Sequence, residues 1–187
     1  MRIQLENIGK IHQTQIDLNG ITAIAGENNT GKSTVGKALF CIFNSFYHLN
    51  QKIRLARREM IAKAVYDSFN KFNSDTGYSI YSTNVADAIL QNKNQYLIEG
   101  QEQALTNLLR YNLYDSWTVT RANAPVITLE LVQNMSGRIK QVLDIPEEQT
   151  FIRVLENTLK QEFSSKVMNF HHSHDIGKIA LQIKNKT

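Results

Sequence analysis

The chain has 187 residues, of which 42% are hydrophobic, and a formal net charge of +4. This length can hold one domain with a sizeable core or one domain plus an insertion, and the apolar content excludes a disordered tail. Cys41 is the only cysteine, so no disulfide can form within one chain, and its apolar neighbours predict a buried, inert thiol. The opening residues lack the apolar core of a signal peptide, and no apolar run approaches the roughly 18 residues of a membrane helix. We therefore expect a cytoplasmic protein with no membrane partner.

The first 25 residues predict three short strands. Residues 2–6 and 13–18 alternate apolar and polar side chains with a turn between them, which indicates an antiparallel hairpin. Asn19 and Gly20 form a strong turn signal. Residues 21–25 are short and mostly apolar, which is typical of a strand buried on both faces.

Helices are expected in the middle of the chain. Residues 35–46 carry apolar side chains at spacings of three and four, which predicts one apolar helix face over three turns. Similar patterns predict helices at residues 51–72, 84–92 and 101–113. Phenylalanines on these faces are expected in the core rather than in base stacking: Phe40, Phe43, Phe46, Phe69 and Phe72.

Strand character returns in the last third of the sequence. Residues 116–120 and 125–132 are rich in β-branched side chains and predict strands, and residues 138–143 are expected to pair back as a hairpin. A proline and two acids predict a helix start at residue 146, running to about residue 163. Residues 178–184 alternate again and predict a final strand.

One segment carries a chemical signal. Residues 26–34, GENNTGKST, match the pattern G-x-x-x-x-G-K-[ST], with an apolar predicted strand before them and an amphipathic predicted helix after them. In this pattern glycines let backbone amides wrap a phosphate chain, and the helix directs its positive end at the anion. Lys32 is expected to contact the β- and γ-phosphates, and the Ser33 hydroxyl to bind Mg²⁺. We therefore predict binding of a nucleoside triphosphate, with ATP and Mg²⁺ as cofactors.

The predicted nucleotide-binding residues are Gly26, Glu27, Asn28, Asn29, Thr30, Gly31, Lys32, Ser33 and Thr34, with Ser33 as the magnesium ligand. Alternatives stay open for four of them. Thr34 contacts the α-phosphate or is only a first-turn helix residue. Asn28 and Asn29 can serve simply to accept left-handed backbone angles, and Glu27 simply to face solvent.

The N-terminal segments also resemble a known family. The opening RIQLENIGKIHQTQIDL, the turn and strand NGITAIAG and the loop GENNTGKST resemble the start of an SMC/RecF-like ATPase, a branch of the ABC class. Asn28 matches the asparagine of the family's loop, while Asn29 replaces its glycine. The motif GENN-x-GKS particularly resembles the corresponding loop of the OLD (overcoming lysogenization defect) family and related defence ATPases.

The resemblance implies an α/β fold: a P-loop NTPase of ABC-ATPase type. Its N-terminal lobe would contain an antiparallel hairpin, a P-loop strand and a large helical insertion. Residues 1–48 would be the P-loop core, residues 49–115 the insertion, and residues 116–187 the return strands and helix of the same lobe. Together they would form one incomplete ATPase head.

Motifs that such a head needs for hydrolysis are missing. No run of four apolar residues is followed by Asp-Glu. Residues 126–130 come nearest to this pattern but are interpreted as an ordinary strand. No LSGG-like signature occurs either. Gln133 is read as a strand end or as the family's metal-sensing glutamine. The resemblance therefore implies an N-terminal portion whose catalytic residues are not identified. It would need a C-terminal half of the same ATPase or a partner head to hydrolyse ATP, and would form a homodimer when complete.

Other functions remain open. A self-contained P-loop kinase or GTPase would need an acidic metal ligand or a substrate lid rich in arginine, and the missing Asp after a buried strand counts against it. A nucleotide-dependent binding module would not hydrolyse at all. Residues 51–71 hold six basic against two acidic side chains, which indicates a solvated helix face or a surface for DNA. His171, His172 and His174 are read as a polar loop or, alternatively, as metal ligands.

Overall fold

The structure is a computed structural model that describes residues 1–74, 76–98, 100, 102–115, 125–163 and 177–182. It divides into two compact units. A sheet unit contains Met1–Leu49 and Phe151–Thr187, and a helical unit contains Asn50–Thr150. The chain therefore leaves the sheet unit after Leu49 and returns to it at Phe151.

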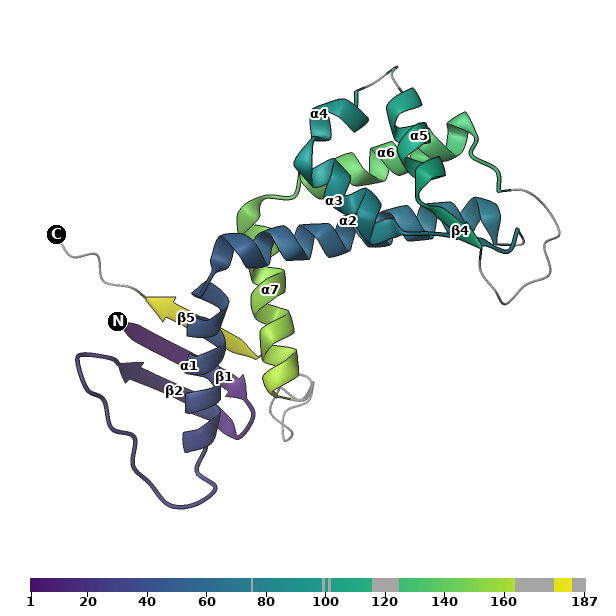
Figure 1. Ribbon diagram of the computed structural model, residues 1–187. Helices are drawn as coiled ribbons and strands as arrows, with labels where there is room; N and C mark the ends of the chain where they lie inside the picture. The colour runs from purple at the N-terminus through teal and green to yellow at the C-terminus, as the bar shows by residue number, and fades with distance from the viewer. Residues whose placement is uncertain (75, 99, 101, 116–124, 164–176, 183–187) are drawn as a thin grey trace. The chain divides into compact units, whose positions relative to one another are not determined.

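Among the described residues, the sheet unit holds three antiparallel strands in the order β2-β1-β5 (Figure 1). These are β1 (Arg2–Ile8), β2 (Ile11–Asp17) and β5 (Lys178–Gln182). Leu5 of β1 lies opposite Thr14 of β2 and Ile179 of β5. The predicted opening hairpin and the predicted late strand are thus confirmed, and the two ends of the sequence meet in one sheet.

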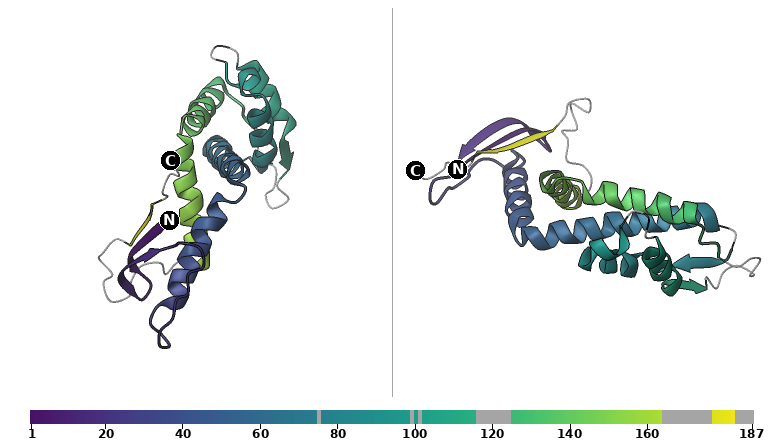
Figure 2. Two further views of the ribbon diagram at one scale, coloured as in Figure 1. Left: turned by 90° about the vertical axis from the view of Figure 1, so that its left-hand side faces the viewer. Right: turned by 90° about the horizontal axis from the view of Figure 1, so that it is seen from above.

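Two of the described helices cover one face of this sheet, as both views of Figure 2 show. They are α1 (Lys32–Phe46) and α7 (Glu147–Glu162). The core between α1 and the sheet is formed by side chains that alternate along the strands or recur at helical spacing: Ile3, Leu5, Ile8, Ile11, Val35, Ala38 and Ile42. The opposite face of the sheet is polar, and there the amide of Gln4 donates a 2.7 Å hydrogen bond to the Gln15 side chain.

The thiol of Cys41 is fully buried, as predicted, on the side of α1 that faces α7. Its sulfur lies 3.8 Å from the Thr158 carbonyl oxygen of α7. Burial raises the pKa of this thiol above its ordinary value, because the thiolate would lose its hydration. The residue therefore acts as a small core side chain between the two helices.

The predicted strand at residues 21–25 is wrong in this structure. These residues are irregular, Ile21 is fully exposed and Ile24 is 42% exposed. A hollow of about 630 Å³ separates the segment from β2 and the start of α1. A strand forms only where neighbours take up its backbone hydrogen bonds, and in the described residues no strand pairs with this segment. The apolar residues 21–25 therefore do not form a strand in the described structure, because no described strand lies beside them to pair with.

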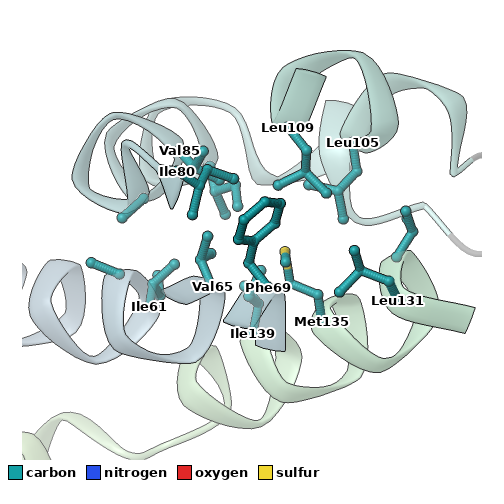
Figure 3. Packing of buried hydrophobic residues seen from close by; sticks show 14 residues of the cluster. Ile61, Val65, Phe69, Ile80, Val85, Leu105, Leu109, Leu131, Met135 and Ile139 are labelled. Atoms are coloured by element: carbon teal, nitrogen blue, oxygen red, sulfur yellow. The ribbon is translucent and has the colours of Figure 1, made fainter. Parts of the chain in front are cut away.

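The helical unit is built around one apolar core. Its helices are α2 (Leu49–Asn73), α3 (Ser82–Gln91), α4 (Lys93–Tyr96), α5 (Gln103–Tyr111) and α6 (Leu129–Leu143). A small ribbon, β3 (Tyr78–Ile80) paired with β4 (Leu113–Asp115), was not predicted, because three-residue strands leave almost no pattern. Figure 3 shows Phe69 of α2 pointing into the centre of this core, between Val85 and Leu109.

The predicted strands at residues 125–132 and 138–143 are also wrong. Residues 125–128 are irregular, and the rest lies in α6 (Leu129–Leu143), which also contains Gln133. The β-branched residues suggested a strand, but the buried positions recur with helical spacing: Leu131, Val132, Met135 and Ile139. The Thr128 hydroxyl accepts a 3.1 Å hydrogen bond from the Leu131 amide and caps the helix. The expected strand at 116–120 lies outside the described residues.

An ion pair between Arg58 and Asp87 joins α2 to α3, with N–O distances of 2.6 and 2.7 Å. The hydrogen bond from Arg58 holds the pKa of the Asp87 carboxyl below its ordinary value. A carboxyl with a lowered pKa in the folded state stabilises the fold above its unfolded pKa, and this contribution disappears as pH falls through the folded pKa.

We therefore expect Asp87→Asn to lower the free energy of unfolding by about 0.5 kcal/mol at pH 7, since both side chains are partly exposed. The difference between wild type and variant should shrink as pH falls through the lowered pKa of the folded-state carboxyl, and it should vanish in strong acid, where that carboxyl is protonated. Urea unfolding at pH 7 and in strong acid measures this. A difference that persists unchanged in acid would show that packing, and not charge, is responsible.

Candidate nucleotide-binding site

The loop at residues 26–34 lies at the N-terminal end of α1, which begins at Lys32. Gly31 precedes the helix in a left-handed conformation, with φ of 92°. A Cβ at this position would lie 3.0 Å from Cγ1 of Ile11 on β2, so both the backbone angle and the close approach require glycine. The second glycine of the motif therefore lets the loop turn tightly against the hairpin.

The side chain of Lys32 folds back into the loop. Its Nζ donates hydrogen bonds to the Gly26 carbonyl oxygen at 2.5 Å and to the Glu27 carbonyl oxygen. The Thr30 hydroxyl donates a 2.9 Å bond to the same Glu27 carbonyl. The ammonium group is thus held at the centre of the loop, where an anion wrapped by the loop would meet it.

The first turn of α1 favours an anion. In this described turn no acidic residue occurs, and no side chain caps the helix at Gly31. The N-terminal amides of a helix carry a partial positive charge, which attracts phosphates and carboxylates. Together with Lys32, they form a positive site at the mouth of the loop.

A cavity of about 490 Å³ lies beside the loop, within the range of small-ligand sites. From the motif it is lined by Asn28, Asn29, Gly31, Lys32, Ser33 and Thr34. Gly26 and Thr30 instead line the hollow under residues 22–26. Glu27 contributes its backbone carbonyl to the loop's own hydrogen bonds. The structure therefore brings together six of the nine predicted residues around one cavity.

The remaining wall of the cavity comes from outside the motif. It consists of Gly9 and Lys10 in the hairpin turn, Lys37 one turn into α1, and Glu162 and Phe163 at the end of α7. Lys10 donates a hydrogen bond from its amine to the Asn29 side chain. None of these five residues was predicted from the sequence as part of the site. Lys37 follows the motif at helical spacing, but the α7 residues approach only through the tertiary fold.

The basic stretch predicted as a solvated face or a DNA surface is mostly engaged within the helical unit. Arg58 pairs with Asp87, and Lys63 lies 3.8 Å from Asp67. One amino group of Arg57 donates a 2.9 Å hydrogen bond to the Ile145 carbonyl. These contacts give the charges an intramolecular role, and binding of DNA stays a prediction.

The histidine cluster at 171–174 lies outside the described residues. In the parts of the chain that the structure describes, no group of three metal-ligating side chains occurs. None of the described helices combines the length and the apolar character needed to cross a bilayer.

The sheet with its two covering helices, together with the helical unit, defines a mixed α/β protein with a positively charged loop at a helix start. A protein-family model described as AAA domain matches residues 2–186, and the chain therefore belongs to the AAA domain family. It is an ATPase-type nucleotide-binding domain, and such domains typically use Mg²⁺. The expected membership in an ATPase family of AAA/ABC type is confirmed. Searches among curated proteins and among solved structures gave no match.

Proposed function

We propose that the chain is the ATP-binding portion of an SMC/RecF-like, ABC-class ATPase, related to the OLD family, and that residues 26–34 hold ATP with Mg²⁺. One observation carries this proposal. The G-x-x-x-x-G-K-[ST] segment lies at the start of α1 and lines a cavity of ligand size, with the Lys32 amine held inside the loop. The family membership supports it independently.

Each residue of the loop has a chemical role in this proposal. Lys32 exchanges its carbonyl partners for β- and γ-phosphate oxygens, and the amides of the loop and the first helical turn bind the same chain of phosphates. Ser33, which is exposed at the cavity, offers its hydroxyl to Mg²⁺, and Thr34 contacts the α-phosphate. The metal, when bound, neutralises phosphate charge.

A second lobe is part of the proposal, because the sheet unit exposes apolar surface that a complete head would cover. Phe40 and Phe43 of α1, expected in the core, are 56% and 52% exposed. Residues 21–25 carry a strand-like sequence without a paired neighbour in the described structure. We infer that strands of a C-terminal half, or of a partner chain, join residues 21–25 and pack against this face. The same half would supply the signature and Asp-Glu motifs, which the 187 residues lack.

Phosphoryl transfer depends on positioning and on stabilising charge at the γ-phosphate. A loop that only cradles the phosphates lowers the barrier little. We therefore expect the 187-residue chain to bind ATP-Mg²⁺, to hydrolyse it negligibly and to remain largely monomeric. When supplied with a C-terminal half that carries the missing motifs, it should hydrolyse ATP slowly and dimerise on binding it.

Steady-state phosphate release and analytical ultracentrifugation with ATP test this expectation, with Lys32→Ala as the matched control. Turnover by the 187-residue chain above about 1 s⁻¹, within the common enzyme range, and abolished in the control, would reveal a complete active site and favour a self-contained kinase or GTPase. Binding without hydrolysis even in the presence of a C-terminal half would favour a non-hydrolysing binding module.

A further inference from the structure

The cavity beside the loop has a wall that the phosphate-binding motif does not supply. This wall is formed by Lys37 of α1 together with Glu162 and Phe163 at the end of α7. The inference drawn from it rests on the proposed function, because it concerns the rest of the same ligand.

The cavity extends along one side of α1, as the positions of its lining residues on this helix show. Thr34 lies against the hairpin turn, since a Cβ on Gly9 would be 3.1 Å from Cγ2 of Thr34. Lys37 follows three residues later and therefore lies one turn further along the same side of the helix. Its amine donates a 3.1 Å hydrogen bond to the Glu162 carbonyl oxygen and lies 3.5 Å from the Glu162 carboxylate. The cavity thus runs from Lys32, past Thr34, to the end of α7.

The groups that line the cavity differ between its loop end and its α7 end. The loop end offers amides and an ammonium group, which suit phosphates. The α7 end offers a carboxylate, which repels phosphates but accepts hydrogen bonds from hydroxyl groups. Lys37 pairs with this carboxylate, and its amine lies 5.7 Å from the centre of the Phe163 ring. An aromatic ring and a hydroxyl acceptor are the groups that a nucleoside needs.

We propose that the end of α7 is the nucleoside-binding wall of the site. Phe163 stacks on the base, Glu162 accepts a hydrogen bond from a ribose hydroxyl, and Lys37 positions the Glu162 carboxylate. Stacking on an aromatic side chain accepts every base, because each base has a flat face. The wall therefore distinguishes a ribonucleotide from inorganic triphosphate more strongly than one base from another.

The test compares three ligands by calorimetry with Mg²⁺ on the 187-residue chain: ATP, 2′,3′-dideoxy-ATP and inorganic tripolyphosphate. Phe163→Leu keeps an apolar side chain but removes the ring, so it should weaken ATP about tenfold and leave tripolyphosphate within twofold. Phe163→Tyr should restore ATP binding. Glu162→Ala should weaken ATP about tenfold but leave dideoxy-ATP, which lacks both hydroxyls, unchanged.

Two controls separate this proposal from packing and from the proposed function. Phe40→Ala removes an exposed ring of α1 that is not part of the cavity wall and should change no affinity. Lys32→Ala should weaken ATP and tripolyphosphate alike. Equal effects of Phe163→Leu on ATP and tripolyphosphate, or no effect on either, would overturn the nucleoside wall while leaving phosphate binding intact. A wild-type chain that binds neither ligand would overturn the proposed function and this proposal together.

Discussion

Replacing Lys32 with alanine is expected to weaken the binding of ATP-Mg²⁺ about 100-fold. Lys32 is the only basic residue among residues 26–34, and its amine already lies inside the loop, bonded to the Gly26 carbonyl oxygen. A hydrogen bond to a charged group contributes about 1.5–3 kcal/mol, and each 1.4 kcal/mol changes affinity tenfold. One ammonium that contacts two phosphates therefore accounts for a loss of this size.

The fold should survive this change, because the partners that Lys32 loses are carbonyl groups of an exposed loop. Thermal unfolding of Lys32→Ala should match the wild type within about 2 °C, which corresponds to a small change in stability. Lys63→Ala is the matched control, since this lysine is 79% exposed and belongs to the helical unit. Calorimetry that finds equal affinity in wild type and Lys32→Ala would rule out residues 26–34 as the phosphate site.

The sequence predicted best those elements that are defined by a short residue pattern and that do not depend on pairing with a distant part of the chain. The opening hairpin and the helices α1, α2 and α7 appear within a few residues of their expected bounds. Residues 21–25 show the opposite case, because a buried strand depends on neighbours that the described structure does not contain. The segment that forms α6 was predicted as strand because of its β-branched residues. The helical spacing of Leu131 and Met135 and the capping residue Thr128 favour the helix that is observed.

The candidate site divides in the same way. The loop residues could be found from sequence because a phosphate cradle needs glycines, a lysine and a hydroxyl at fixed spacing within one turn. Glu162 lies 125 residues after Lys37 in the chain, and no sequence pattern predicts that their side chains meet. Only the antiparallel return of α7 beside α1 completes the cavity.

Replacing Phe69 with alanine should produce a large loss of stability, because Phe69 is the bulkiest fully buried side chain among the described residues. The side chain is fully buried, and its ring lies among residues from α2, α3, α5 and α6 (Figure 3). Removing a buried phenylalanine costs about 3–5 kcal/mol, through lost burial and the cavity left behind. Since whole domains are stable by only about 5–15 kcal/mol, this one change removes a large part of what holds the helical unit together.

The effect should be visible as a fall in the unfolding temperature of at least 10 °C or so. It should also appear as faster hydrogen exchange of amides in α2, α5 and α6, whose side chains share the core with Phe69. Tyr66→Ala, three residues earlier on α2 and 47% exposed, is the matched control and should change stability by no more than about 0.5 kcal/mol. If both variants unfold at the same temperature, Phe69 does not occupy the centre of the core, and the packing of α2 against α5 and α6 must differ from that described.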